Sequence, residues 1–234
     1  MRRLNAVPTE RFHLWLMLAS TFSTGMIDAL GYLGLDQVFT GNMTGNVLLL
    51  GMAFAGGADL PTLRPALALV CFMLGAALAG RVLRRGAEGW STRVSLSLGV
   101  VAGWIALLAV FTALVDVQAV DVLGSITTSS MATAMGIQAA TARHLKVAEI
   151  STVVVTSTIT GLASDSRLAG GDSHFWARRV LAVLLILLGA VAGAALLNVG
   201  LWLGFTVSAL ISTTVAVSGS VRHHRERRSA VGSS

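Results

Sequence analysis

Charged residues are scarce in this sequence, and the motifs of common enzymes are missing. Only 12% of the 234 residues are charged, compared with about a quarter in an average soluble protein. The single cysteine, Cys71, lies in an apolar segment, which excludes an internal disulfide or a cysteine-based metal cage and favours a small packing residue. The sequence has no His-x-x-x-His pair, paired-carboxylate motif, Gly-x-Ser-x-Gly elbow or nucleotide-binding loop before a lysine. We therefore expect neither an enzyme nor a protein with a metal or other cofactor.

Apolar residues dominate instead. They make up 54% of the chain, and the mean hydropathy is +0.76. A helix of about 20 apolar residues is enough to cross a hydrocarbon core of roughly 30 Å. The sequence thus predicts an all-α integral membrane protein with six full transmembrane helices, at residues 12–33, 66–83, 94–115, 126–142, 177–197 and 201–219. The first of them is too long for the core of a cleavable signal sequence and contains Asp28, so we expect it to be retained.

Basic residues outnumber acidic ones, with a formal charge of +6 and a pI of about 11.2. Their positions argue against nucleic-acid binding, because they cluster beside the apolar spans, where positive charge marks the cytoplasmic side of a membrane. The clusters are Arg2, Arg3 and Arg11; Arg81, Arg84, Arg85 and Arg93; Arg143 and Lys146; Arg178 and Arg179; and the tail from Arg222 to Arg228. We expect no nucleic-acid partner, and we interpret the tail as a topological anchor or a contact for anionic lipid headgroups.

The two halves of the chain resemble each other at a displacement of about 111 positions. Four apolar segments begin near residues 12, 38, 66 and 94, and four more begin near 123, 149, 177 and 205. Short matches agree with this register, such as the residues from Gly25 onward and those from Gly136 onward. We therefore divide the chain into a first membrane repeat at 1–117, a second at 118–221 and a basic cytoplasmic tail at 222–234.

Segments 38–57 and 149–164 are ambiguous, because each can either cross the membrane or turn back. If both turn back, every strong basic cluster falls on the cytoplasmic side, while Asp59 and the connection from Asp116 to Asp121 fall outside. The chain then has six spans plus two interrupted or re-entrant segments, and the two repeats are inverted, as in many transporters and channels. The alternative is full crossing of both segments, which gives eight spans in parallel repeats.

Small residues four positions apart predict close helix packing. Such spacing puts both residues on one helical face and lets two backbones approach within the bilayer. The pairs are Gly75 and Ala79, Ala76 and Gly80, Gly99 and Gly103, and Gly189 and Gly193. They do not distinguish packing inside one bundle from packing in a homo-oligomer.

Asp28 is the clearest functional candidate. An ionised carboxylate inside an apolar span costs several kcal/mol unless it is hydrated, paired or protonated, so it should face the protein interior. One hypothesis is proton coupling or cation binding. The other is that Asp28 lies near the outer end of its helix and caps the backbone of the interrupted segment.

The run 38–46 supplies a second group of candidates. Thr40, Asn42, Thr44 and Asn46 stand at alternate positions, which on an extended stretch would point to one side. A helix beginning near Thr44 would direct its free N–H groups and positive dipole end toward the membrane centre, where an anionic or polar solute could bind. The alternative is that these side chains only satisfy the interrupted backbone.

Further candidates come from both halves. Tyr32 is the only tyrosine, and Gln138 is an uncharged amide in a mainly apolar span; the alternative for both is a simple hydrogen bond to a neighbouring helix. In the second half, hydroxyl groups replace the amides, at Ser151, Thr152, Thr156, Ser157, Thr158 and Thr160. From these we include Tyr32, Gln138, Thr156 and Thr158 in the candidate binding set.

The residues from Gly25 to Gly51, above all Asp28-Ala-Leu-Gly-Tyr-Leu-Gly and the later Asn42-Met-Thr-Gly-Asn46, resemble the YoaK-like family of bacterial membrane proteins, which is named for a domain of unknown function. The resemblance implies a multi-pass protein of the bacterial inner membrane and supplies no substrate. Such proteins tend to carry Gly-Met-Gln-Asn and a second Thr-Gly in their second half. This chain instead has Gly136-Ile137-Gln138-Ala139 and Thr156-Ser157, so no amide role is carried over to position 139.

These observations favour transport or channel-mediated passage of an unidentified small polar solute, with the bilayer as surroundings and both termini in the cytoplasm. The competing hypothesis is a non-transporting membrane scaffold or assembly protein. A polar cavity that reaches Asn42 from one side would favour transport, and a dry, tightly packed interior would favour the scaffold. A homo-oligomer fits either hypothesis.

Overall fold

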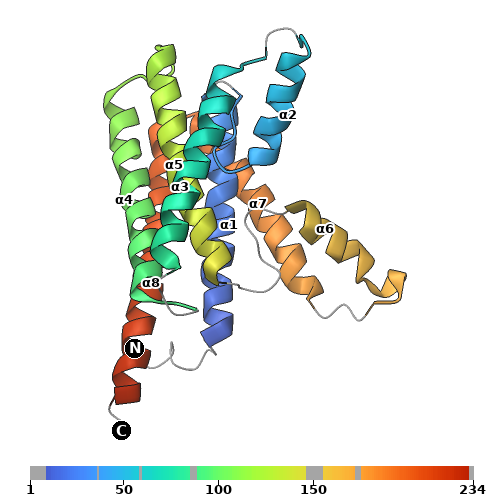
Figure 1. The fold of residues 1–234 in the computed structure, drawn as a ribbon, viewed down its shortest axis with the longest axis vertical. Coiled ribbons are helices and arrows are strands. Elements are labelled where there is room, and N and C mark those ends of the chain that lie inside the picture. The colour runs from blue at the N-terminus through green and yellow to red at the C-terminus, as the bar shows by residue number, and fades with distance from the viewer. Residues whose placement is uncertain are drawn as a thin grey trace.

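The computed structural model describes residues 9–35, 37–57, 60–84, 89–145, 155–171 and 175–231. The predicted residues Arg2, Arg3, Asp59, Arg85, Lys146, Ser151 and Thr152 lie outside these ranges. Within the ranges the chain is all-helical (Figure 1). The elements are α1 (Thr9–Gly34), α2 (Met43–Phe54), α3 (Leu63–Leu83), α4 (Thr92–Leu114), α5 (Asp121–Leu145), α6 (Val155–Ser164), the short 3-10 helix η2 (Arg167–Ala169), α7 (Trp176–Leu197) and α8 (Leu201–Val231).

Five of the described helices, α1, α3, α4, α7 and α8, are long and apolar enough to cross a membrane. The sixth expected span falls within α5, which has 25 residues but is enriched in serine and threonine, so it is not among the five. The helix ends follow local sequence signals. Ser91, for example, caps α4 by accepting a hydrogen bond from the Val94 N–H at 3.3 Å. The chain is therefore an all-α membrane protein.

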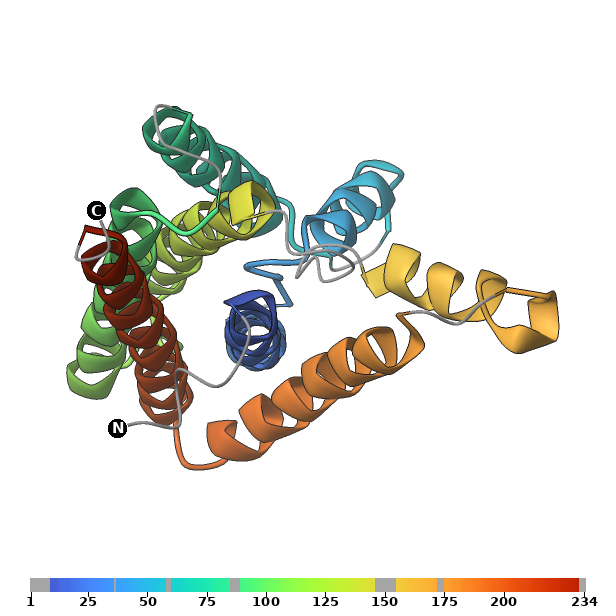
Figure 2. The same ribbon diagram turned by 90° about the horizontal axis from the view of Figure 1, so that it is seen from below.

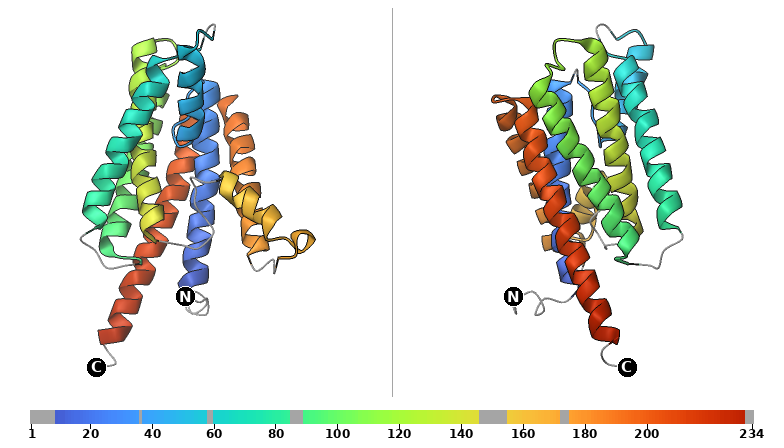
Figure 3. Two further views of the ribbon diagram at one scale, coloured as in Figure 1. Left: turned by 45° about the vertical axis from the view of Figure 1, so that its right-hand side comes forward. Right: turned by 90° about the vertical axis from the view of Figure 1, so that its left-hand side faces the viewer.

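The long helices lie side by side and alternate in direction (Figures 1 and 3). Helices α1, α4 and α7 run one way, and α3, α5 and α8 run the other, so the start of α1 and the end of α8 lie at the same end of the bundle. Helix α8 was expected to end near residue 219 but continues through the basic tail to Val231. The tail up to that residue is thus the last part of a helix that projects beyond its neighbours (Figure 3).

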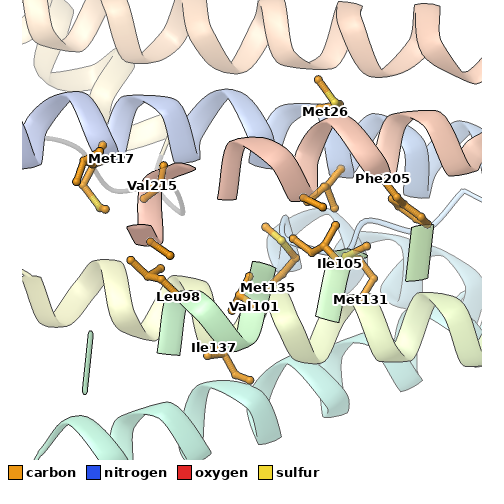
Figure 4. Close-up of a cluster of buried hydrophobic side chains, with 14 of the residues drawn as sticks. Met17, Met26, Leu98, Val101, Ile105, Met131, Met135, Ile137, Phe205 and Val215 are labelled. Carbon is orange, nitrogen blue, oxygen red and sulfur yellow. The ribbon is translucent and has the colours of Figure 1, made fainter. Parts of the chain in front are cut away.

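The centre of the bundle is an apolar core shared by α1, α4, α5 and α8 (Figure 4). Its fully buried side chains, less than 2% exposed, include Met17, Met26, Ile105, Met131 and Phe205. A smaller cluster of Val38, Ala68 and Ala132 packs against Cys71.

Glycines bring two pairs of helices into close contact, α1 with α7 and α3 with α5. A Cβ atom on Gly25 would collide with the carbonyl oxygen of Ile186, and one on Gly189 would collide with that of Phe22. In the second pair, Gly136 lies against the Phe72 carbonyl and Gly75 against that of Thr133. These contacts place backbone on backbone, as small residues permit in membrane helices.

Some of the predicted small-residue pairs do not pack inside the chain. Added Cβ atoms on Gly80, Gly99 and Gly103 would meet no described atom within 4 Å apart from their own stretch of helix backbone. These three glycines therefore make no close helix contact within the described chain, and packing between two copies of the chain stays a prediction.

Helices α2 and α6 have 12 and 10 residues, so they are about 18 and 15 Å long and too short to cross a membrane alone. Helix α2 packs on α3, and α6 packs on α7. Both lie on the same side of the bundle, and their first turns are the nearest parts of the two helices in each view (Figures 1 and 2). The two helices do not pack against each other.

Candidate functional site at the start of α2

A tight reversal after α1 brings the chain back along the helix it has just left. Gln37 adopts a left-handed conformation with φ of 56°, and its N–H donates to the Tyr32 carbonyl at 3.0 Å. The returning segment then lies directly on α1. A Cβ atom on Gly31 would be only 2.7 Å from the Val38 carbonyl oxygen, so glycine at this position permits the close approach.

Asp28 holds the returning segment in place. Its Oδ1 atom accepts hydrogen bonds from the backbone N–H groups of Thr40 at 3.0 Å and Gly41 at 2.7 Å, with a longer contact of 3.4 Å from Asn42. Three successive N–H groups that converge on one oxygen form a small anion-binding nest. The carboxylate of the chain itself occupies this nest, which is the capping arrangement that we considered for Asp28.

The side chain of Asn46 closes the same turn from the α2 side. Its amide nitrogen donates to the Phe39 carbonyl at 2.6 Å, and its Oδ1 accepts the Phe39 N–H at 3.0 Å. Asn46 is fully buried. One side chain thus satisfies both backbone polar groups of Phe39, a residue outside the helices, which lowers the cost of an interrupted backbone inside a membrane.

Asn42 is the N-cap of α2. Its Oδ1 accepts a hydrogen bond from the Gly45 N–H at 3.2 Å. The helix begins at Met43, one residue before the expected start near Thr44. Asn42 and Thr44 are exposed, whereas Thr40 and Asn46 are buried. Because α2 begins at Met43, the four residues do not form one extended stretch, and their side chains do not share one environment.

Tyr32 joins the site through an aromatic contact. Its ring stacks on that of Phe39, with centroids 4.7 Å apart and planes inclined by 27°. The Phe39 ring in turn lies where a side chain on Gly45 would be, since a Cβ atom there would be 2.6 Å from it. Six predicted residues, Asp28, Tyr32, Thr40, Asn42, Thr44 and Asn46, therefore belong to one local structure. We call it the α1–α2 turn.

Gln138 lies deeper, between α1 and α5. Its amide nitrogen donates to the hydroxyl of Thr24 at 3.0 Å, and both side chains are buried. Thr24 is one helical turn before Asp28. Close by, the methyl group of Met135 is 3.3 Å from the position of a Cβ atom on Gly41. Gln138 thus connects two helices next to the α1–α2 turn.

Thr156 and Thr158 lie apart from that turn, in α6. Thr156 is exposed and Thr158 is buried. Helix α6 is held by Arg179 of α7, which is only 8% exposed and donates to the Gly161 carbonyl and, at 2.6 Å, to the Asp165 carboxylate. The hydrogen bond from Arg179, with a second from Ser164, holds the pKa of Asp165 below its usual value.

Sequence reasoning missed the partners that shape the turn, namely Gly31, Gly41, Gly45, Phe39 and Thr24. The high frequency of glycine in residues 31–51 was a usable signal, since glycine marks close backbone approach. The contact of Thr24 with Gln138 had no signal in the sequence. Within the described ranges, no three histidine, cysteine, aspartate or glutamate side chains gather into a group that could hold a metal ion.

Comparison with known proteins identifies relatives without a known activity. A profile of the family described as "Protein of unknown function (DUF1275)" matches residues 16–218. The UPF0700 transmembrane protein YoaK of Bacillus subtilis (strain 168) is 33% identical over 147 residues, which cover 61% of this chain and 62% of that protein. The chain thus matches somewhat less than two thirds of the length of this relative. No solved structure matches.

Proposed function

This chain belongs to the DUF1275 family of YoaK-like membrane proteins, and we propose that it provides a path for a small polar solute across the membrane, with the α1–α2 turn as the binding region. The observation that carries the proposal is the interrupted backbone between α1 and α2. Helix α2 starts part-way along α1, and Asp28 and Asn46 hold its first turn from two sides. Irregular backbone at membrane depth is tolerated where it is buried in protein or lines a water-filled cavity, and transporters use such breaks to bind solutes.

The charge of the turn indicates the class of solute. Asp28 already occupies the N–H groups that would otherwise attract an anion. The exposed groups beside it are the Asn42 amide and the Thr44 hydroxyl, which both donate and accept hydrogen bonds. This combination favours a neutral or cationic polar solute over an anion, and it narrows our expectation from the sequence, which included anions.

We further propose that the chain consists of two inverted repeats with six full spans, in which α1 to α4 correspond to α5 to α8. Corresponding helices run in opposite directions in Figure 1. Gly25 corresponds to Gly136 at 111 positions and Gly75 to Gly189 at 114 positions. With these displacements, the glycine contacts of α1 with α7 map onto those of α5 with α3.

The orientation of the protein in the membrane follows from its basic residues. Arg11, Arg81, Arg93, Arg143 and Arg178 all lie at the end of the bundle where α1 begins and α8 ends. Because positive charge concentrates on the cytoplasmic side, we propose that both termini face the cytoplasm of a bacterial cell.

A non-transporting scaffold is the second candidate, and the packed core favours it. The space between α1, α4, α5 and α8 is filled by large apolar side chains (Figure 4). A transport path would therefore run on the side of α1 that faces α2 and α6, and it would require movement of these short helices.

The experiment that tests transport uses the purified full chain in proteoliposomes. Osmotic shock with glycerol, urea, methylammonium or formate is followed by light scattering. We expect flux of at least one of the first three solutes above that of empty vesicles. The double substitution of Asn42→Leu and Thr44→Val should lower this flux at least fivefold, whereas the exposed control Thr213→Val should not.

Two outcomes would overturn the solute class or the function. Flux of formate alone would contradict a neutral or cationic solute. Flux at the level of empty vesicles for all four, from protein that unfolds cooperatively on heating, would favour the scaffold.

A proton-coupled version of the proposal makes a separate prediction for Asp28. The amide introduced by Asp28→Asn keeps an oxygen that can accept the three N–H groups but cannot exchange a proton near neutral pH. If Asp28 couples transport to protons, the pH dependence of flux disappears in this variant. An unchanged pH profile would assign to Asp28 a purely structural role.

A further inference from the structure

A groove lies between the first turns of α1 and the last turns of α8, far from the α1–α2 turn. It encloses about 470 Å³. Its walls include Phe12 of α1 and, from α8, Val217, Val221, Arg222, Arg225 and Glu226. The residues from α8 are spaced so that they share one face of the helix.

The groove has both apolar and basic side chains in its lining. Val217 and Val221 lie on the side nearer the membrane core, Arg222 directly follows Val221, and Arg225 lies about one turn beyond Val221 toward the end of α8. Helix α8 has 31 residues and is therefore about 46 Å long, whereas the hydrocarbon core is roughly 30 Å thick. The last turns of α8, which carry its arginines, extend beyond the neighbouring helices (Figure 3), and from this length we place them at the level of the lipid headgroups.

Two contacts hold the charged part of the groove in a defined geometry. The Arg222 guanidinium lies over the Phe12 ring, 5.0 Å from its centroid, and its Nε donates to Glu226 at 2.9 Å. Residues 222–228 contain four arginines and one glutamate, so this end of α8 keeps a strong positive charge. Arg225, one turn further along, is exposed beside the groove.

We propose that this groove binds an anionic phospholipid. An acyl chain lies along Val217, Val221 and Phe12, and the phosphate lies at Arg222 and Arg225. The apolar part of the groove favours this ligand over a free phosphate, because a free phosphate has no acyl chain that could occupy it. The excess positive charge distinguishes it from a zwitterionic lipid, because basic clusters at a membrane surface attract anionic headgroups. The site is independent of the proposed transport path.

The test uses the purified full chain in a non-ionic detergent. Dioleoyl phosphatidylglycerol, the matched phosphatidylcholine and glycerol 3-phosphate are titrated separately. Native mass spectrometry counts the bound lipids, and thermal unfolding measures stabilisation by ligands that bind the native state. We expect phosphatidylglycerol to bind at least tenfold more tightly than phosphatidylcholine and to raise the melting temperature, and glycerol 3-phosphate to have no effect.

Two exposed arginines provide a matched pair of variants. Arg225→Gln removes a charge from the groove, and Arg228→Gln removes the same charge outside its lining. We expect at least a fivefold loss of phosphatidylglycerol affinity in the first variant and less than a twofold change in the second. Val221→Trp fills the groove from an exposed position without changing the charge, and it should also weaken binding.

Three results would overturn the proposal. Equal losses in Arg225→Gln and Arg228→Gln would indicate a diffuse surface charge. Equal stabilisation by both lipids would indicate an unspecific apolar contact. An effect of glycerol 3-phosphate as large as that of the lipid would assign the groove to a soluble phosphate compound.

Discussion

The short helices α2 and α6 are held at opposite ends by side chains of opposite charge. At the start of α2, the Asp28 carboxylate of α1 accepts backbone N–H groups. Near the end of α6, the Arg179 guanidinium of α7 donates to the Gly161 carbonyl. Each charge has the sign that its helix terminus favours, negative at the start and positive at the end.

This difference shows how a short helix can be fixed inside a membrane protein in two ways. In both cases a long neighbouring helix supplies one charged side chain, which satisfies backbone groups that a break in the chain leaves without partners. The surroundings differ, however. The start of α2 is a compact turn with a buried amide, whereas Asp165 beside Arg179 is largely exposed. We therefore expect α2 to be the more firmly held of the two.

The largest loss of stability should come from substitutions at the glycine contacts between the long helices. Gly25→Leu and Gly136→Leu each force a side chain into a carbonyl group of the facing helix. We expect each to cost at least about 3 kcal/mol, at the upper end of what overpacking costs. Chemical denaturation in detergent measures this loss. Gly99→Leu is the control, because no described atom lies within 4 Å of its added Cβ, and it should change stability by less than about 0.5 kcal/mol. If only one of the two substitutions lowers stability, the proposed correspondence between the two halves is contradicted.

The next largest loss of stability should come from the start of α2. Asp28→Ala leaves the N–H groups of Thr40 and Gly41 without their acceptor. We expect a loss of about 2 to 3 kcal/mol, in line with the cost of unsatisfied buried polar groups. The same denaturation assay compares it with Asp28→Asn, which keeps an acceptor and should lose less than half as much. Equal losses in both variants would show that charge, rather than the hydrogen bonds, fixes the turn.

The corresponding change at α6 should be smaller. Arg179→Ala removes the donor to Gly161, and we expect a loss of about 1 kcal/mol, because water can reach the partly exposed end of α6 and replace it. Proteolysis between α6 and α7 measures the local opening. Arg179→Lys should recover only part of the protection, since lysine lacks the planar fork of arginine. A loss larger than that of Asp28→Ala would reverse our ranking of the two helices.

The smallest effect is a pH dependence at Asp165. The pKa of this carboxyl is lower in the folded protein than its usual value near 3.8, chiefly because Arg179 donates to it. A depressed folded pKa stabilises the native state above the unfolded pKa, and this stability is lost as pH falls through the folded value. Wild type should thus be slightly more stable than Asp165→Asn at pH 6, and the difference should shrink below about pH 4. Thermal unfolding across this range is the measurement, and a difference that grows at low pH would contradict the assignment.

Much of the architecture could be predicted from local signals. Apolar runs of about 20 residues located α1, α3, α4 and α7 to within a few residues, and the crowded glycine, threonine and asparagine residues marked the break before α2. The end of α8 was predicted too early, because hydropathy stops at the membrane surface whereas backbone hydrogen bonding continues through the arginines to Val231.

The site was only partly predictable. The residues of the α1–α2 turn are close in sequence, so their grouping was accessible from spacing alone. Their roles were not, since Thr40 and Asn46 turn inward while Asn42 and Thr44 remain exposed. That division depends on where α2 begins and on how Phe39 packs on Tyr32.

Composition and hydrophobic spacing alone determined that this chain is an all-α membrane protein with a break after its first span, because the cost of placing polar backbone in lipid acts on every residue separately. Only the tertiary structure decided that Asp28 closes the nest at α2, that Arg179 closes α6 and that Gln138 bonds to Thr24. These contacts join side chains whose positions depend on the packing of whole helices, and glycine contacts between backbones set that packing.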